Sequence, residues 1–200
     1  MAVVVKLGGS LTASGRLPAL MGELARSASA GQPIVAVPGG GPFADAVRAA
    51  QVGSGFDDGA AHDMALLAMA QYGLMLAALT PRRARLAWGA AAVAAALTNY
   101  SGEPLIWLPD PRHDGQGLER SWRITADSLA LWLAGSLALD RVLLVKTCAA
   151  PAETSLAALA AAGIVDAAYP ELAARYPGVT TTVIYAAQTA ALTAALAAQS

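Results

Sequence analysis

Only two lysines, Lys6 and Lys146, occur among the 13 lysine and arginine residues of this 200-residue chain. Each ends an apolar run, "AVVVK" or "RVLLVK", that is typical of a buried strand. A lysine ammonium is a compact point charge, whereas an arginine guanidinium is a planar fork. We therefore interpret these positions as places that require lysine chemistry, with a snorkelling lysine at a strand end as the structural alternative.

Two glycine clusters follow strand-like runs near the start of the chain. Gly8 and Gly9 follow the first run, and Gly39, Gly40 and Gly41 follow "PIVAV", just before a helix that is expected to begin near Pro42. Backbone N–H groups at a helix N-terminus bind anions, and the helix dipole adds partial positive charge there. The pair of clusters predicts two phosphate-binding turns at the carboxyl edge of one sheet. Tight connections without a ligand are the alternative.

Several familiar motifs are absent from the sequence. It contains no Gly-x-x-x-x-Gly-Lys-Ser/Thr, which excludes a P-loop enzyme, and no Gly-x-Gly-x-x-Gly follows the first strand. It also lacks a cysteine pair and a His-x-x-x-His motif, so neither a zinc site nor any other protein-bound metal is expected.

Strand-like runs alternate with segments of helical periodicity, which predicts one α/β domain over residues 1–200 with a largely parallel sheet. The predicted strands are 3–6, 33–37, 104–108, 142–146 and 180–185, with a short edge strand at 85–87. The predicted helices are 17–28, 42–50, 60–78, 90–97, 126–137, 156–162, 167–175 and 187–198. Residues 109–122, rich in proline, glycine and charge, are expected to form a surface loop or hairpin.

The composition limits the kinds of partner. The chain is 56% hydrophobic and 14% charged, but its longest apolar stretch, 64–80, is interrupted by Gln71 and Gly73 and is too short to cross a bilayer. A net charge of −1 gives no field that would attract nucleic acid. The single cysteine, Cys148, and the lack of a signal peptide suit the cytoplasm. The sparse charge indicates contacts buried in an oligomer.

The segment "SWRITADSLALWLAG" predicts a helix capped by Thr125, with Asp127 in its first turn. A carboxylate there is favoured by the helix dipole alone. If it faces the carboxyl edge of the sheet, it could instead orient Lys6, Lys146 or both. Three further cations, Arg112, His113 and Arg120, lie in or near the long loop, where solvated charge is as good an interpretation as phosphate binding.

The segments "VVKLGGSL", "VPGGGPFADAVR" and "ITADSLALWLAG" resemble, in order and spacing, the amino acid kinase superfamily. That group includes acetylglutamate, carbamate, uridylate and isopentenyl phosphate kinases and aspartokinase, and the resemblance covers essentially the whole chain. The short length, "RSWRITADSLALWLAG" and "AAHDMALLAMAQYG" are most similar to the aminomethylfuran phosphate kinases of methanofuran biosynthesis, which have homologues in the one-carbon metabolism of methylotrophs. The resemblance implies a three-layer αβα sandwich with a mainly parallel central sheet, assembled as a homodimer or higher homo-oligomer.

The resemblance also implies an activity. ATP, carrying Mg²⁺, would donate its γ-phosphoryl group to a phosphate monoester, (aminomethyl)furanylmethyl phosphate. Lys6 would stabilise the moving phosphoryl group, and Asp127 would orient Lys6. The expected nucleotide-phosphate ligands are Gly8, Gly9, Ser10, Lys146 and Thr147. The expected acceptor ligands are Gly39, Gly40, Gly41, Arg48 and His62, although Arg48 on a solvated helix face and His62 as a packing residue are the structural alternatives.

The chain departs from the superfamily pattern in two places. Relatives usually follow the late strand with Thr-Asp and a glycine-containing turn, whereas this chain reads "KTCAAPAETS", with Cys148 at the aspartate position. Relatives also bring a second lysine from the C-terminal third, a role for which Lys146 or Arg175 is the candidate here. These departures leave open a catalytically silent binding or scaffold protein, and a kinase for another phosphate or carboxylate acceptor.

Overall fold

One six-stranded sheet, with all strands parallel, forms the centre of the computed structural model, which describes residues 1–149 and 154–198. The strand order across the sheet is β3-β4-β2-β1-β5-β6. The strands are β1 (Val3–Leu7), β2 (Ile34–Pro38), β3 (Arg85–Trp88), β4 (Leu105–Leu108), β5 (Arg141–Lys146) and β6 (Thr180–Tyr185). Because β1 lies between β2 and β5, the end of the first strand meets the ends of both neighbours at the same edge.

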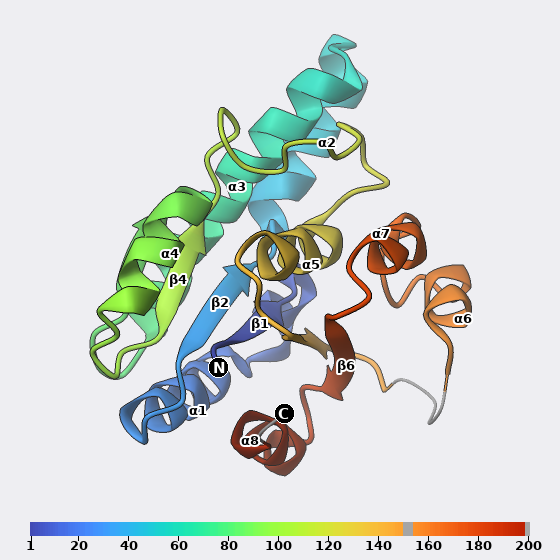
Figure 1. Ribbon diagram of the computed structural model, residues 1–200. Helices are drawn as coiled ribbons and strands as arrows, with labels where there is room; N and C mark the ends of the chain where they lie inside the picture. Colours follow the sequence, from blue (N-terminus) through green and yellow to red (C-terminus); the bar gives the residue numbers. More distant parts are fainter. Residues whose placement is uncertain (150–153, 199–200) are drawn as a thin grey trace.

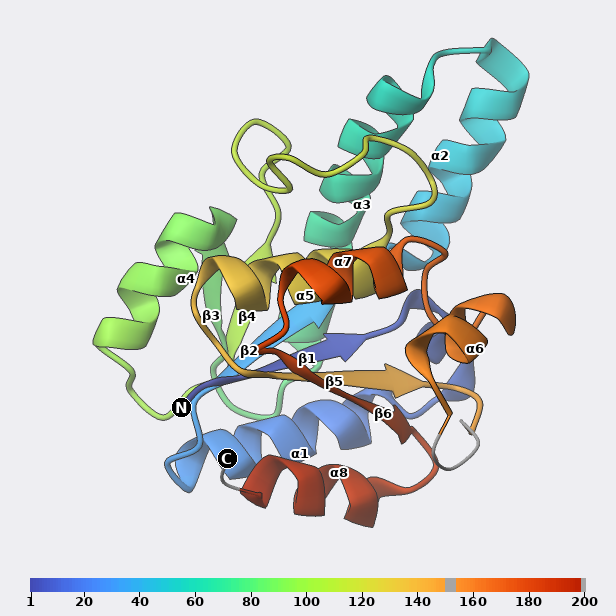
Figure 2. The ribbon, with the colours of Figure 1, turned by 45° about the vertical axis from the view of Figure 1, so that its right-hand side comes forward.

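Helices cover both faces of the sheet, which gives the predicted αβα sandwich (Figures 1 and 2). Helices α1 (Leu17–Ser29) and α8 (Thr189–Ala197), with the second half of α3 (Asp58–Leu79), pack on one face. The other face is covered by α4 (Gly89–Thr98), α5 (Ala126–Ser136), α6 (Leu156–Ala161) and α7 (Tyr169–Arg175). Helix α2 (Gly41–Ser54) pairs with α3, and both extend past the sheet as an arm (Figure 2).

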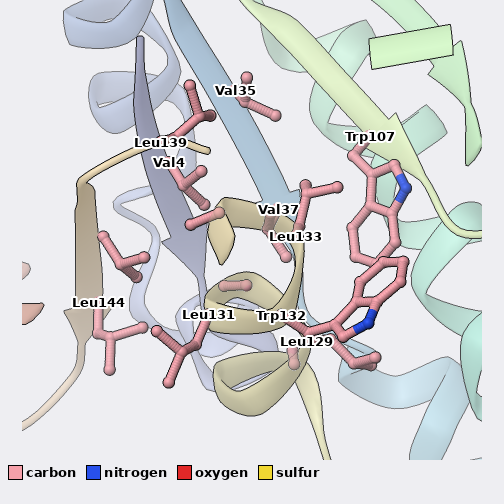
Figure 3. Packing of buried hydrophobic residues seen from close by; sticks show 14 of the residues in the cluster. Val4, Val35, Val37, Trp107, Leu129, Leu131, Trp132, Leu133, Leu139 and Leu144 are labelled. Carbon is pink, nitrogen blue, oxygen red and sulfur yellow. The ribbon is translucent and has the colours of Figure 1, made fainter. Parts of the chain in front are cut away.

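The central strands are apolar without interruption because both of their faces are buried. Alternate side chains of β1 point to opposite faces of the sheet, so that Val4 packs with α5 while Val3 and Val5 pack with α1. Figure 3 shows the α5 side of this core, where Trp132 approaches Trp107 of β4. Their ring centroids are 6.3 Å apart and their planes are inclined by 32°.

The predicted strands agree with the observed ones to within one residue at each end, including the edge strand β3. Two helices of the arm are longer than predicted. Helix α2 continues to Ser54 and ends at Gly55, whose φ of 72° is left-handed. Helix α3 begins at Asp58 because the Asp57 side chain accepts a hydrogen bond of 2.7 Å from the Ala60 N–H. A 3₁₀ helix, η1 (Gly9–Ser14), was not predicted, since its residues show no apolar periodicity.

Helix α3 is 22 residues long and, within the described ranges, is the one helix whose length and composition would allow it to cross a membrane, which corrects the expectation that its apolar segment is too short. Core helices of soluble proteins pass the same test. Part of its apolar surface packs against α2, β2 and β4. Met64, Leu67 and Leu74 on its other side are 39–46% exposed.

Residues 109–122 form a loop that is fastened to the sheet by one buried carboxylate. Asp114, 5% exposed, accepts hydrogen bonds from Trp107 Nε1 at 3.2 Å, from the Asp110 N–H at 2.8 Å and from the Ala90 N–H at 2.9 Å. The loop therefore has a fixed root, from which its later residues reach the α2–α3 arm.

Candidate active site

The two glycine turns lie at the carboxyl ends of neighbouring strands and pack directly on each other. The Gly39 N–H donates to the Leu7 carbonyl at 2.8 Å. A Cβ added to Gly9 would lie 2.3 Å from the nitrogen of Gly41, and one added to Gly39 would lie 2.4 Å from the nitrogen of Gly9. Both distances are far below van der Waals contact with rigid backbone, so glycine is required for the turns to approach. The result is one bare backbone surface at the N-terminus of α2.

Three charged side chains meet beside this surface. Lys6 Nζ lies 2.8 Å from Asp127 Oδ1, and Lys146 Nζ lies 2.5 Å from Asp127 Oδ2. The side chains of Lys6, Lys146 and Asp127 are 8%, 12% and 4% exposed. Asp127 therefore bridges two buried ammonium groups, one from the end of β1 and one from the end of β5.

This arrangement changes the proton affinities of the three groups in different directions. Burial lowers the pKa of Lys6, but the attraction of Asp127 is stronger, so the pKa of Lys6 lies above its usual value. Burial and the neighbouring Lys6 charge together lower the pKa of Lys146. Burial would raise the pKa of Asp127, yet the two ammonium groups outweigh it and lower that pKa. At neutral pH the trio carries one net positive charge.

The first turn of α5 is held by a residue from another part of the chain. Thr125 occupies the N-cap position, but its side chain makes no capping bond, which corrects the prediction that Thr125 caps the helix. Instead, Asp166 Oδ2 accepts hydrogen bonds from the N–H groups of Thr125 and Ser128, both at 2.9 Å, and Thr125 Oγ1 donates to Asp166 Oδ1 at 2.5 Å. A carboxylate satisfies more N–H groups than a hydroxyl and complements the helix dipole, so Asp127 stands on a firmly fixed turn.

The predicted nucleotide-phosphate ligands also gather at this edge. Ser10 Oγ and Thr147 Oγ1 are 3.4 Å apart, which joins the segment after β1 to the end of β5. A Cβ added to Gly8 would lie 3.2 Å from Lys6 Nζ, so glycine there keeps the ammonium group accessible. Cys148 is exposed, and the rest of the unusual turn, residues 150–153, lies outside the described residues.

The two candidates for the second lysine role lie in different places. Lys146 touches Asp127, as described above. Arg175, in the last turn of α7, donates from Nη1 to the Gly117 carbonyl at 3.4 Å and so contacts the long loop. Of the two candidates, Lys146 is thus the one that lies in the charged cluster.

A cavity of about 520 Å³ opens from Lys6 and the glycine turns toward the α2–α3 arm. Its lining includes Lys6, Gly9 and the residues Gly39–Gly41. The rest of the lining is partly apolar and partly polar. The apolar part includes Ala44, Ala65, Leu66, Met69, Ile124 and Leu129, and the polar part includes Ser10, Thr12, Asp45, Arg48, His62, Trp122 and Thr125.

Arg48 and His62, predicted as acceptor ligands, both line this cavity. His62 is 6% exposed, and burial lowers its pKa, so the ring is neutral at pH 7. The Arg48 guanidinium lies 4.1 Å above the centre of the Trp122 ring and 3.5 Å from Asp45 Oδ1. The lining of the cavity therefore includes a neutral imidazole and a cation that lies over an aromatic ring.

The two arginines among the candidate cations of the long loop have protein partners. Arg112 forms two hydrogen bonds with the Asp110 carboxylate, at 3.0 and 2.9 Å. Arg120 contacts Asp63 Oδ2 at 2.5 Å and the Gly59 carbonyl at 3.1 Å, which fastens the loop to α3. His113 is exposed. These contacts favour structural roles for the two arginines.

Sequence reasoning missed several residues that support the site. Tyr72 of α3, fully buried, lies beneath the glycine turns, accepts a hydrogen bond from Thr12 Oγ1 at 3.0 Å and donates one to the Gly8 carbonyl at 3.4 Å. Asp166 and Trp122 were also missed, because their partners are distant in the sequence. The aspartate in "GIVDAAYPEL" carried a weak signal, since it precedes a helix and could be taken as its cap.

Comparisons with known proteins identify the family of the chain. The sequence model of the Amino acid kinase family matches residues 1–149. The chain belongs to the amino acid kinase family. Among curated proteins no match to the chain was found.

The described residues contain no group of three or more histidine, cysteine, aspartate or glutamate side chains that could hold a metal ion.

Solved structures of similar fold extend the comparison beyond residue 149. Uridylate kinase from Archaeoglobus fulgidus has a TM-score of 0.70 and 16% identity, over 100% of this chain and 97% of that one. UMP kinase from Bacillus anthracis has a TM-score of 0.71 and 17% identity, over 98% of this chain and 91% of that one. UMP kinase from Ureaplasma parvum has a TM-score of 0.64 and 16% identity, over 92% and 89%. At these identities the likeness establishes the shared fold.

Proposed function

We propose that this amino acid kinase family member transfers the γ-phosphoryl group of ATP to a phosphate monoester, (aminomethyl)furanylmethyl phosphate, in the biosynthesis of a methanofuran-type cofactor. One observation carries the proposal. The Lys6–Asp127–Lys146 cluster lies where the two glycine turns meet, and Lys6 and the glycine backbone open into a cavity of about 520 Å³.

In this reaction an oxygen of the acceptor phosphate attacks the γ-phosphorus of ATP. A new P–O bond forms, the bond between the γ-phosphorus and the β,γ-bridging oxygen breaks, and ADP leaves with that electron pair. The products are ADP and a diphosphate ester. The nucleophile is already an ionised oxygen, so no general base is needed, and catalysis consists of aligning two anions and neutralising their charge.

Lys6 suits the central role because it lines the same cavity as both glycine turns and its raised pKa keeps it charged. Lys146, together with the Ser10 and Thr147 hydroxyls, would contact the ATP phosphates from the β5 side. Asp127 would act as a positioning residue that holds both ammonium groups at one place. Its two oxygens separate the lysines, which would otherwise repel each other.

Mg²⁺ would arrive with ATP rather than on a protein site. Both Asp127 oxygens already contact ammonium groups, which makes this carboxylate a poor metal ligand. When bound, the ion would neutralise charge on the β- and γ-phosphates. The glycine turns and the two lysines fit a polyphosphate, which needs N–H donors and positive charge rather than carboxylates.

The cavity suits an acceptor with a small apolar body. Its lining combines alanine, leucine, isoleucine and methionine side chains with Lys6 and the glycine turns. A phosphate ester of a small ring would place its phosphate at the charged and glycine residues and its ring against the apolar side chains.

The test is an ADP-release assay with Mg-ATP across a panel of acceptors. The panel contains (aminomethyl)furanylmethyl phosphate, isopentenyl phosphate, UMP, and acidic amino acids. The proposal expects the furanyl ester to give the highest kcat/KM. A preference for another acceptor in the panel would support the kinase activity and identify a different acceptor. No ADP release with any acceptor would contradict both the activity and the acceptor.

A second candidate, a binding or scaffold protein without transfer activity, is favoured by the departure at Cys148 from the Thr-Asp turn of relatives. Calorimetry with Mg-ATP separates the two. No binding at millimolar nucleotide would favour the scaffold, whereas binding followed by turnover would exclude it.

We further propose a homodimer or higher homo-oligomer. The exposed Met64, Leu67 and Leu74 lie on one side of α3 and would be covered by a second copy. Light scattering coupled to size exclusion tests the assembly, and a mass of one chain, 20.1 kDa, would contradict it.

A single exposed cysteine, Cys148, suits the reducing cytoplasm, which is the location we propose.

A further inference from the structure

The ring of Trp122 is fixed at the wall of the acceptor cavity by the α2–α3 arm. Its Nε1 donates to Gln51 Oε1 at 2.7 Å, and Gln51 Nε2 in turn donates to Asp58 Oδ1 at 2.8 Å. The ring also packs with the apolar cluster that contains Val47 and Ala61. A tryptophan in a long loop is thus held in one orientation by residues of two helices.

Arg48 depends on this ring for its own position. Arg48 and Gln51 lie one turn apart on α2, so the ring that Gln51 fixes covers the Arg48 guanidinium at 4.1 Å. The other contact of Arg48, Asp45 Oδ1 at 3.5 Å, joins side chains that are 49% and 73% exposed. Such an exposed pair restrains an arginine weakly, whereas stacking on an indole holds the guanidinium plane.

The Arg48 guanidinium carbon lies 4.1 Å from the centre of the indole ring. A guanidinium that stacks on an aromatic face keeps the N–H groups of its edge free for an anion. Arg48 lines the same cavity as Lys6 and the turn at Gly39–Gly41. An anionic acceptor in this cavity would therefore find both the glycine turn and a pre-oriented arginine in the cavity lining.

We propose that Trp122 is a positioning residue for acceptor binding: fixed by Gln51, it holds the Arg48 guanidinium over its ring at the cavity wall, where Arg48 binds the acceptor phosphate. This inference rests on the proposed function for its acceptor. It assigns to the long loop a share in acceptor affinity through Trp122.

The test is a double-mutant cycle on Trp122 and Arg48, read as the Kd of (aminomethyl)furanylmethyl phosphate by calorimetry without ATP. We expect Trp122→Leu to weaken binding roughly tenfold when Arg48 is present and by no more than about twofold in an Arg48→Ala background. Trp122→Phe keeps a ring face but loses the hydrogen bond to Gln51, and should fall between wild type and Trp122→Leu. In turnover assays, acceptor KM should rise while the KM of Mg-ATP stays within about twofold.

A tryptophan elsewhere provides the matched control. Trp88 of β3 is 56% exposed and lies outside the cavity lining, so Trp88→Leu should leave acceptor binding unchanged. An equal loss for Trp122→Leu in both Arg48 backgrounds would show that Trp122 only anchors the loop, and would overturn the proposal. If Trp122→Leu does not fold, the same double-mutant cycle with Trp122→Phe tests whether the effect on acceptor binding depends on Arg48. A wild-type enzyme that neither binds nor phosphorylates the ester contradicts the proposed function instead, so the two failures are distinguishable.

Discussion

The two sides of Lys6 are built differently. On the acceptor side, two glycine turns, the α2–α3 arm and a fastened loop enclose a cavity of about 520 Å³. On the β5 side, Lys146 and Thr147 contribute an ammonium and a hydroxyl, and the next residue, Cys148, is exposed. Among the described residues that line the cavity, Lys6 is the one member of the charged trio.

This difference indicates which part of the chemistry is strongly specified. The acceptor side has shape, apolar walls and several polar groups, so it can select among small esters. The described residues of the β5 side supply an ammonium and a hydroxyl for the phosphates of the donor. We therefore expect selectivity for the acceptor to be high.

Removal of the shared cation should have the largest effect. Lys6→Ala deletes the ammonium group between the two sides, and we expect turnover to fall about 10²–10³-fold, as for other lost transition-state contacts. Circular dichroism should show an unchanged fold, since Asp127 keeps Lys146 as its partner. Arg82→Ala, which removes an exposed cation elsewhere, is the control. Turnover near the wild-type rate would refute the role of Lys6.

The Asp127→Asn variant affects both sides together, because it leaves two buried ammonium groups without their carboxylate. We expect a loss of about 3 kcal/mol in unfolding free energy at pH 7, measured with urea. The folded-state pKa of Asp127 is lowered, so its contribution is complete above the unfolded pKa of about 3.9 and disappears as the pH falls through the folded value. The gap between wild type and variant should therefore close only in acid. An unchanged stability at pH 7 would contradict the bridging role.

Lys146→Arg should have the smallest effect and concerns the β5 side alone. The pKa of Lys146 is lowered by burial and by Lys6, whereas that of Lys6 is raised, so Lys146 loses its proton first as the pH rises. As the pH is raised, wild-type kcat should therefore begin to decrease before the pH reaches 10.4, the usual pKa of lysine. Arginine stays charged, so the variant should lose a few-fold at pH 7.5 yet keep its activity to higher pH. Identical alkaline limbs in the pH–rate profiles would exclude Lys146 as the titrating group.

Much of the fold followed from the sequence because strands and helices here have distinct apolar patterns. The runs "AVVVK" and "RVLLVK" predicted β1 and β5, and parallel pairing then brings Lys6 and Lys146 to one edge. Patterns within a segment could not reveal contacts between distant segments. Asp166 caps a helix that begins 40 residues earlier in the chain, and Trp122 meets Gln51 across 71 residues. The glycine clusters were predicted as phosphate turns, but their mutual packing depends on the neighbouring placement of β1 and β2.

The central claim is that Lys6 and the two glycine turns form one site of phosphoryl transfer between ATP and a phosphate monoester. Phosphorus NMR of the protein with Mg-ATP and (aminomethyl)furanylmethyl phosphate tests it most directly. The account predicts that the monoester resonance is replaced by the coupled pair of a diphosphate ester, as ADP appears in equal amount. ADP and inorganic phosphate with the monoester unchanged, or no reaction, would contradict it.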